Sequence, residues 1–310
     1  MTHKKKKIIA IVGPTASGKT DLSIKLAQLL DGEIISADSR LVYRDFNIGT
    51  AKPTKEELQT VPHYCIDIVN PSISYTVGDY KAHVEEILQN LFKAGKVPII
   101  AGGTGFYVRS VLEGLDIPDV KPNFEFREAM EKIVKEKGKE ALFELLKEKD
   151  PVIAKKLHLN DTFRIIRALE VQNTLGKPMS EVQVMSEPKY DVVYAGLGAE
   201  DREFLYDRIN KRVDIMIQSG LVDEVKFLVN KYGKTLSLLK TLGYKEICGY
   251  LDNEKTLEES VEDIKKNTRN YAKRQLTWFR ANKNIKWYFI DRESKEEICE
   301  SVIKRYNDGI

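Results

Sequence analysis

Cysteine is scarce in this sequence, which contains only Cys65, Cys248 and Cys299. An odd number of widely separated cysteines argues against a disulfide framework, and no two of them have the spacing of a zinc site. The four histidines are scattered as well, and no Ser/His/Asp arrangement stands out. We therefore expect a protein of the reducing cytoplasm.

The sequence also lacks a long apolar run and an excess of charge of one sign. No stretch is long and apolar enough to cross a membrane, and the run behind the basic first residues is too short for a signal peptide. Lysine and arginine total 50 against 47 aspartates and glutamates, which leaves a net charge of +3. Nucleic-acid binding therefore cannot be inferred from net charge and would need a local cluster of basic residues.

What the sequence does contain is a glycine-rich segment with the pattern of a phosphate-binding loop. A β-branched apolar run at residues 7–12 precedes it, and apolar residues at helical spacing follow over residues 20–30. This order of strand, loop and helix predicts that backbone N–H groups of the loop point at one anion. Lys19 would add a positive charge, and the Thr20 hydroxyl could bind Mg²⁺. The predicted loop consists of Gly13, Pro14, Thr15, Ala16, Ser17, Gly18, Lys19 and Thr20.

Strands and helices alternate through the first 119 residues. Such alternation predicts an α/β fold of the P-loop NTPase type, a parallel sheet with helices on both faces. Because ligands bind at the carboxyl ends of parallel strands, Thr15, Asp38 and Thr104 should face one crevice. The predicted elements are strands at residues 32–39, 61–69 and 96–101 and helices at residues 80–94 and 106–112.

The pattern changes near residue 120. Residues 120–189 are rich in charge and helical in spacing, and strand-like sequence then returns at residues 192–197. We interpret residues 120–189 as an α-helical subdomain inserted into a P-loop core of residues 1–119 and 190–310. The later predicted elements are helices at residues 204–219, 222–232 and 256–280 and a closing strand at residues 285–290.

Two candidates for chemistry lie outside the loop. Asp38 follows a predicted strand, so its carboxylate could be a general base, a metal ligand or the cap of a turn; Asp67 also follows apolar residues, and the sequence leaves these roles open. Arg208 and Arg212 are four residues apart on one helical face and could grip a diphosphate. Their spacing alone favours surface ion pairs with neighbouring acids such as Asp207.

Residues 268–280 combine basic and aromatic side chains on one predicted helix. At about 100° per residue, Arg269, Lys273 and Arg280 share one stripe. The aromatic residues lie roughly opposite, where they could pack on a core or stack on a base. Because no acidic residue interrupts it, the stripe favours nucleic-acid binding over a merely solvated face. The aromatic residues are Tyr271, Trp278 and Phe279.

Five short segments, taken together and in order, carry a family resemblance. They are residues 13–20, Ser-Ala-Asp-Ser-Arg-Leu-Val-Tyr at 36–43, Gly-Gly-Thr-Gly at 102–105, Arg-Ile-Ile-Arg-Ala-Leu-Glu-Val at 164–171 and Lys-Arg-Gln-Leu-Thr-Trp-Phe-Arg at 273–280. Together they resemble the tRNA dimethylallyltransferases, also called tRNA isopentenyltransferases, of the bacterial type. The loop alone is shared with many kinases, but the combination is specific.

The resemblance implies transfer of a dimethylallyl group from dimethylallyl diphosphate to N6 of adenosine 37, beside the tRNA anticodon, giving N6-(dimethylallyl)adenosine. It implies that the loop, with Mg²⁺ on Thr20, holds the diphosphate leaving group. Asp38 corresponds to the carboxylate that takes or hydrogen-bonds the N6 proton, and Thr15 and Arg208 belong to the same catalytic set. We expect a monomer whose partners are this donor and tRNA.

The resemblance also implies which residues contact the anticodon stem-loop of the tRNA. They come from the core and from the helical insertion, which corresponds to a mobile domain that closes on the stem. The residues are Asp38, Ser39, Arg40, Leu41, Thr104, Arg127, Thr162, Phe163, Arg164, Ile165, Ile166, Lys240, Thr241, Leu242, Gly243, Tyr244, Lys273, Arg274, Gln275, Leu276, Thr277, Trp278, Phe279 and Arg280.

Two other functions would use the same features. A small-molecule or nucleoside kinase would hold ATP on the loop and use Asp38 to orient an acceptor hydroxyl. An RNA-binding module would carry a degenerate nucleotide site. The basic and aromatic helix ending at Arg280 argues against the kinase, and the intact Lys19, Thr20 and Asp38 argue against a degenerate site.

Overall fold

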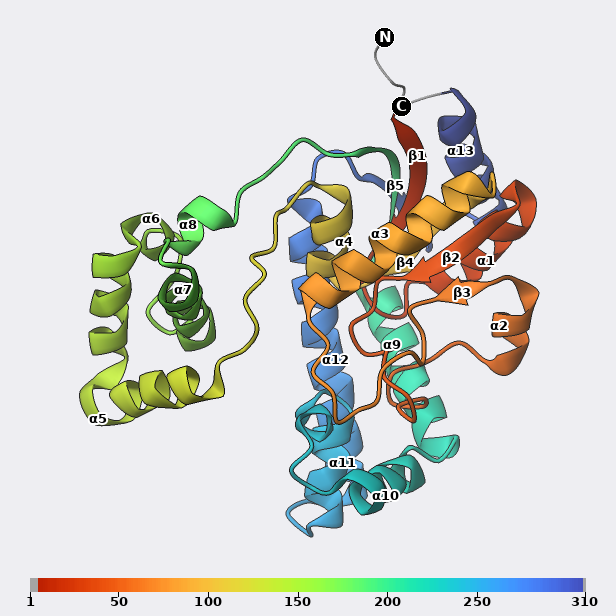
Figure 1. Ribbon diagram of the computed structural model, residues 1–310. Helices are drawn as coiled ribbons and strands as arrows, with labels where there is room; N and C mark the ends of the chain where they lie inside the picture. Colours follow the sequence, from red (N-terminus) through yellow and green to blue (C-terminus); the bar gives the residue numbers. More distant parts are fainter. Residues whose placement is uncertain (1–4, 309–310) are drawn as a thin grey trace. The chain divides into compact units, whose positions relative to one another are not determined.

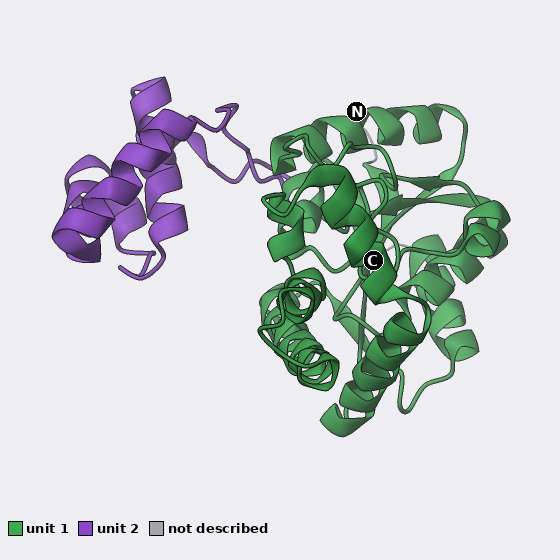
Figure 2. Ribbon diagram, turned by 90° about the horizontal axis from the view of Figure 1, so that it is seen from below, with its two compact units in different colours: residues 1–112, 189–310 green, residues 113–188 purple. Residues whose placement is uncertain are grey.

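The structure is a computed structural model that describes residues 5–308, and the chain forms two compact units. The first unit combines residues up to 112 with residues from 189 onwards, and the second consists of residues 113–188 (Figure 2). Between residues 5 and 308, no helix is both long and apolar enough to span a lipid bilayer.

A parallel sheet of six strands forms the centre of the first unit (Figure 1). The strand order is β3-β2-β4-β1-β5-β6, and every neighbouring pair runs parallel. This arrangement confirms the predicted α/β fold of the P-loop NTPase type. The strands are β1 (Lys6–Val12), β2 (Gly32–Ser36), β3 (His63–Tyr64), β4 (Val97–Gly102), β5 (Tyr190–Gly198) and β6 (Lys286–Phe289).

Several helices of the first unit begin at capping residues. Thr76 accepts a hydrogen bond from the Asp79 N–H, and the Asp79 side chain accepts one from the Thr76 N–H, so α3 starts three residues before the predicted residue 80. Thr256 and Glu259 cap α12 in the same way. The helices are α1 (Lys19–Leu30), α2 (Lys55–Thr60), α3 (Val77–Lys93), α4 (Gly105–Leu112), α9 (Arg202–Gln218), α10 (Leu221–Tyr232), the 3₁₀ helix η1 (Ser237–Lys240), α11 (Tyr244–Leu251), α12 (Leu257–Arg280) and α13 (Lys295–Asp308).

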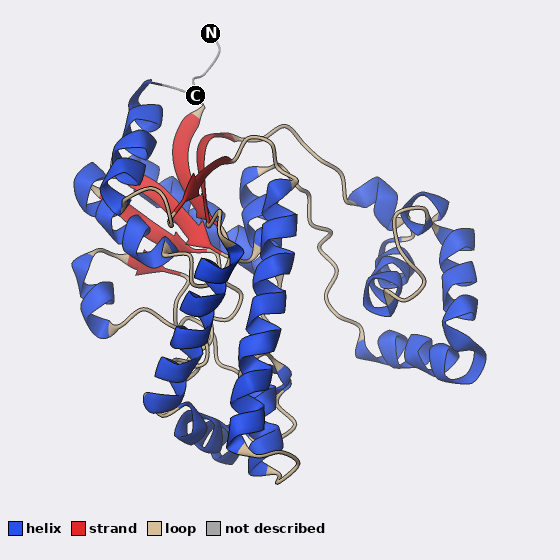
Figure 3. Ribbon diagram, turned by 180° about the vertical axis from the view of Figure 1, so that it is seen from behind, coloured by secondary structure: helices blue, strands red, loops and turns tan. Residues whose placement is uncertain are grey.

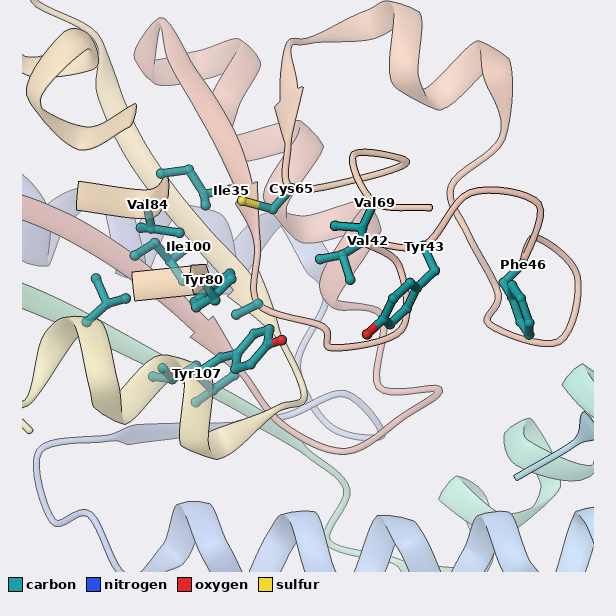
Figure 4. Packing of buried hydrophobic residues seen from close by; sticks show 14 of the residues in the cluster. Ile35, Val42, Tyr43, Phe46, Cys65, Val69, Tyr80, Val84, Ile100 and Tyr107 are labelled. Atoms are coloured by element: carbon teal, nitrogen blue, oxygen red, sulfur yellow. The ribbon is translucent and has the colours of Figure 1, made fainter. Parts of the chain in front are cut away.

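Helices cover both faces of the sheet, as Figure 3 shows. Successive strand residues point to opposite sides of the sheet, and both sides carry apolar side chains that must be buried. In β1, Ile8 and Ala10 belong to a buried cluster that includes side chains of α3 and α4, whereas Ile9 and Ile11 pack with α1 and α13. Figure 4 shows part of the first cluster, where tyrosine rings of α3 and α4 stack with their centroids 3.9 Å apart. The strand that leads into the phosphate-binding loop is therefore buried on both sides.

The predicted strand at residues 61–69 is wrong over most of its length. Of this segment, only residues 63–64 form a strand, β3, which pairs with β2. Val69 forms an isolated bridge with Tyr43. Cys65 and Asp67 have φ values of 60° and 55°, and a residue in this left-handed region breaks the extended backbone of a strand. The sequence prediction also contains no counterpart of α13.

The second unit is helical and has its own core. Leu142 and Leu146 pack in one buried cluster with Ile165 and Leu169. Gly138, with a φ of 86°, interrupts the longest helix and kinks it. The helices are α5 (Phe124–Lys149), α6 (Pro151–Ala154), α7 (Thr162–Leu175) and α8 (Met179–Val182).

A buried carboxylate, that of Glu170 on α7, joins the two main helices of this unit. It accepts two hydrogen bonds of 2.8 Å from the Arg127 guanidinium, one of 2.6 Å from Arg167 and one of 2.7 Å from the Asn123 N–H. Burial acts to raise the pKa of Glu170, but these hydrogen bonds outweigh it and lower the pKa to about 2. The ionised Glu170 carboxylate thus attaches the start of helix α5 to helix α7.

We predict that Glu170→Ala lowers the free energy of unfolding of this unit by about 3 kcal/mol, because two arginines lose their buried partner. Hydrogen–deuterium exchange of peptides from α5 and α7 in the full chain would measure the loss. Because the folded-state pKa lies below the ordinary 4.5, the contribution is present above pH 4.5 and is lost as the pH falls towards 2.

Glu144 provides the matched control, because it pairs with Lys147 at an exposed position of α5. Glu144→Ala should leave exchange in both helices unchanged, since exposed pairs contribute little. Equal exchange in the two variants would contradict the structural role of Glu170.

Candidate active site

The phosphate-binding loop, residues 13–20, connects β1 to α1 in a conformation that requires small residues. Gly13 has a φ of 142°, and a Cβ at this position would lie 2.3 Å from the carbonyl oxygen of Leu197 on β5. Gly18 and Ala16 have left-handed backbone, with φ values of 84° and 63°, and Gly18 is the residue from which α1 starts. Side chains at either glycine would strain the loop.

The turn leaves several backbone donors of the loop unpaired. In the described part of the chain, no backbone carbonyl accepts a hydrogen bond from the N–H groups of residues 16–19. Ser17 Oγ donates to Pro14 O at 2.9 Å, which keeps the loop in this shape. Unpaired N–H groups at a helix N-terminus, together with the positive end of the helix dipole, form a site for a phosphate-like anion.

Lys19 brings a positive charge to the loop, and the pKa of its amino group is depressed. Its Nζ donates to Pro14 O at 2.6 Å, so the amino group lies over the loop. Burial lowers the pKa of Lys19 to about 7, the Arg212 guanidinium acts in the same direction, and the Asp38 carboxylate opposes them. An anion on the loop would favour the charged form and raise this pKa again.

Two arginines of α9 bind the loop. Arg208 Nε donates to Ala16 O at 2.8 Å, and Arg212 Nη1 donates to Thr15 Oγ1 at 3.0 Å. Burial and the neighbouring Arg208 lower the pKa of Arg212. The surface ion pairs that the spacing alone favours are therefore wrong, because apolar residues of α9 pack beside Ala16 and bring this face of the helix to the loop.

Asp38 lies in the turn after β2. Its Oδ1 accepts a hydrogen bond from the Arg40 N–H at 2.8 Å, which orients the carboxylate and leaves Oδ2 able to accept a proton. Thr104, directly before α4, accepts a hydrogen bond from the Ser39 N–H at 3.0 Å and donates its own N–H to Ala37 O at 3.0 Å. The turns after β2 and β4 are thereby joined.

Gln275 of α12 joins the phosphate-binding loop to the turn after β4. Its Oε1 accepts a hydrogen bond from the Thr15 N–H at 2.9 Å, and its Nε2 donates to Gly103 O at 2.9 Å. Thr15, Asp38 and Thr104 thus lie at the same edge of the sheet, as expected for the carboxyl ends of parallel strands.

Glu224 of α10, which sequence reasoning does not single out, holds the chain that follows Asp38. Its carboxylate accepts hydrogen bonds from the N–H groups of Asn47, Ile48 and Gly49 at 3.0, 2.8 and 3.1 Å. The Tyr244 hydroxyl donates to the same carboxylate at 2.8 Å. Only the folded chain brings α10 to this loop, so no local pattern marks Glu224.

The outer face of α12 is basic, but its aromatic residues do not form one opposite face. Lys273 and Arg280 are exposed. Phe279 is buried, whereas Trp278 is 38% exposed and meets Phe106 edge-on with ring centroids 6.5 Å apart. Phe279 therefore packs in the core, one of the two roles expected of these aromatic residues. Trp278 remains accessible for the other, stacking on a base, because adjacent helical residues point about 100° apart.

The segments predicted to contact tRNA contain exposed, half-buried and buried side chains. The exposed ones are those of Arg40, Phe163, Arg164, Lys240, Lys273, Arg274, Thr277, Trp278 and Arg280. Half-buried are Asp38, Ser39, Leu41, Thr104, Thr162, Thr241, Leu242 and Leu276. The buried ones are Ile165, Ile166, Tyr244, Gln275 and Phe279, and the Arg127 guanidinium is engaged by Glu170. Buried side chains serve packing here, so any contact with RNA falls to their exposed neighbours.

The protein oxygen ligands at this site suit Mg²⁺ only in combination with a phosphate ligand. Among residues 5–308, no three His, Cys, Asp or Glu side chains are grouped so that they could hold a metal ion. Mg²⁺ commonly binds through one or two protein oxygens and the phosphate oxygens of a substrate. The hydroxyl of Thr20, the second residue of α1, fits that role.

This edge of the sheet can bind a diphosphate and accept a proton beside it. The loop N–H groups, Lys19, Arg208 and Arg212 could provide positive charge for the anion, and the Asp38 carboxylate could act as a base. Such an arrangement suits a transfer reaction in which an anionic phosphate group departs while the acceptor loses a proton.

Comparison with known proteins also points to a transfer reaction. The chain matches the family model described as IPP transferase over residues 41–282. A tRNA dimethylallyltransferase of Thermoanaerobacter sp. (strain X514) is 49% identical over 303 residues, 96% of each chain. The crystal structure of a full-length tRNA isopentenylpyrophosphate transferase from Bacillus halodurans has a TM-score of 0.73 at 39% identity, over 98% of each chain. A eukaryotic dimethylallyltransferase acting on tRNA has a TM-score of 0.82 at 28% identity, over 98% of this chain and 79% of that one.

These similarities extend over nearly the whole chain and confirm the resemblance carried by the five sequence segments. They do not favour the kinase alternative, because the relatives are prenyl transferases by name. The chain therefore belongs to the IPP transferase family, the family of the tRNA dimethylallyltransferases.

Proposed function

We propose that this chain transfers a dimethylallyl group from dimethylallyl diphosphate to N6 of adenosine 37, beside the anticodon of a tRNA. The products are N6-(dimethylallyl)adenosine and pyrophosphate. The observation that carries the proposal is the junction of the phosphate-binding loop with the Asp38 turn at one edge of the sheet, in a chain 49% identical to a tRNA dimethylallyltransferase.

Stabilisation of the leaving group is the main catalytic effect in this proposal. An exocyclic aromatic amine is a poor nucleophile, so departure of the diphosphate from the allylic carbon must be made favourable. The negative charge is shared among the N–H groups of residues 16–19, Lys19, Arg208 and Arg212. These groups already lie at the loop, so little rearrangement opposes the reaction.

Asp38 acts on the acceptor. The bond between C1 of the dimethylallyl group and the diphosphate oxygen breaks, and its electron pair leaves with pyrophosphate. The bond between N6 and C1 forms, and N6 loses a proton to Asp38 Oδ2, which passes it to water. The Arg40 N–H holds Oδ1 and so orients the carboxylate for this step.

Thr15 and Thr20 complete the donor site. Thr15 contributes a hydroxyl that already binds Arg212, and Thr20 would hold Mg²⁺ together with the diphosphate oxygens. Bound Mg²⁺ supplies additional positive charge to the departing diphosphate.

Exposed residues of both units would contact the tRNA. In the first unit we assign this role to the turn of residues 38–41, Thr104, the accessible residues 240–242 and the outer face of α12. In the second unit we assign it to Phe163, which is 74% exposed, and Arg164, the exposed residues of the segment 162–166, and this unit would close on the anticodon stem. The adenine must leave its stack to reach Asp38, at a cost of a few kcal/mol.

The direct test incubates the full chain with Mg²⁺, dimethylallyl diphosphate and unmodified tRNA, and analyses the digested nucleosides by mass spectrometry. We expect an adenosine that is heavier by one dimethylallyl group and that maps to position 37. Turnover of ATP without a prenylated adenosine would support the kinase instead.

We predict that Asp38→Ala lowers kcat by about 10²- to 10⁴-fold, because the amine loses its proton acceptor. The affinity for tRNA, measured by filter binding, should fall by less than about tenfold. Asp67→Ala is the matched control: Asp67 follows β3 as Asp38 follows β2, but it pairs with Lys52, and its loss should leave kcat nearly unchanged. A parallel loss of tRNA binding in Asp38→Ala would make Asp38 a docking residue.

We predict that the affinity for dimethylallyl diphosphate falls as the pH rises above 7, by up to about tenfold per pH unit. Burial and Arg212 lower the pKa of Lys19 to about 7 in the free protein, so a proton must be taken up on binding at higher pH. Calorimetric titrations between pH 6.5 and 9 would measure the effect. Lys19→Arg should abolish the slope, because a guanidinium stays charged throughout this range. A slope shared by both proteins would assign the titration to another group.

We predict that Lys273→Ala weakens tRNA binding and reduces the slope of log K against log salt by about 0.7 to 0.9, as expected for one lost phosphate contact. Lys304→Ala, an exposed lysine of α13, is the control and should leave the slope unchanged. An unchanged slope in Lys273→Ala would remove α12 from the interface with RNA.

A further inference from the structure

Gln275 is a polar side chain in the interior of the first unit. It belongs to a segment of α12 whose neighbours Lys273 and Arg274 are exposed, yet Gln275 itself is only 6% exposed. The resemblance to the family implies contact between this segment and tRNA. The buried amide cannot make that contact, so its place in the fold needs another explanation.

The two hydrogen bonds of the Gln275 amide have opposite directions. Oε1 accepts from the Thr15 N–H, and Nε2 donates to the Gly103 carbonyl oxygen, both at 2.9 Å. Only a side-chain amide provides an acceptor and a donor together at this length; a carboxylate would accept but not donate. The space is also fitted to the amide, because a Cβ on Gly103 would lie 2.2 Å from Nε2.

The two partners of Gln275 belong to the two halves of the active site. Thr15 directly precedes the unpaired N–H groups of residues 16–19, which form the donor side. Gly103 directly precedes Thr104, whose hydroxyl accepts from the N–H of Ser39, the neighbour of Asp38 on the acceptor side. A short chain of hydrogen bonds therefore runs from the phosphate-binding loop to the Asp38 turn through Gln275.

We infer that Gln275 is a positioning residue that fixes the phosphate-binding loop against the Asp38 turn. This role rests on the proposed function, in which the allylic carbon and N6 must come within reacting distance. Misplacement of reacting groups by about 1 Å can lower a rate by about 100-fold. Removal of the amide would also leave the part-buried Thr15 N–H and the buried Gly103 carbonyl unpaired, which would loosen both halves of the site.

The test compares Gln275→Met and Gln275→Glu with the wild type in the full chain. Methionine keeps the length of the side chain but makes neither hydrogen bond, whereas the carboxylate keeps only the acceptor. We expect kcat at saturating substrates to fall by about 10- to 100-fold in Gln275→Met, with tRNA affinity within about threefold of wild type. The opposite pattern, unchanged kcat with weakened tRNA binding, would overturn the inference and make Gln275 an RNA contact.

A second measurement does not depend on activity. Exchange of the Thr15 amide proton, followed by NMR with ¹⁵N-threonine, should be at least about tenfold faster in Gln275→Met and should stay protected in Gln275→Glu. Inactivity of the wild type in the tRNA assay would refute the proposed function, whereas equal Thr15 exchange in all three proteins would refute the bridge. Ser260→Ala, which alters another buried polar residue of α12, is the control and should change neither kcat nor exchange.

Discussion

The proposed catalysis depends on the backbone N–H groups of residues 16–19, which the loop between β1 and α1 leaves without backbone acceptors. The arrangement is costly, because left-handed backbone at Ala16 and buried donors without acceptors both raise the free energy of the fold. It persists because β1 lies in the middle of the sheet and is buried by helices on both sides. In the proposed reaction, a bound diphosphate would supply the hydrogen-bond acceptors that these N–H groups lack.

The charged groups around this loop follow from the same requirement. Lys19, Arg208 and Arg212 converge on a few loop atoms, and their mutual repulsion contributes to the depressed pKa values of Lys19 and Arg212. The Asp38 carboxylate offsets only part of it. A site with this excess of positive charge suits a multiply charged anion, such as the diphosphate that leaves in the proposed reaction.

Buried and half-buried polar side chains fix several backbone segments of both units. Gln275 joins two loops, Glu224 accepts three backbone N–H groups from one loop, and Glu170 holds the start of α5. Each accepts hydrogen bonds from backbone N–H groups that would otherwise be unpaired. Each therefore stabilises the fold and holds its backbone segment in one conformation. Flexible turns at the sheet edge can thereby hold a defined geometry.

The sequence by itself determined the α/β fold, the phosphate-binding loop and the family, because alternating apolar runs, glycines and five short motifs are local properties. Local spacing misjudged residues 61–69, where left-handed residues end the strand, and the partners of Arg208 and Arg212. It also could not reveal Gln275 as a bridge. Only the tertiary structure decided these points, because a helix exposes several faces and the packing of α9 and α12 beside the loop selects which face meets it.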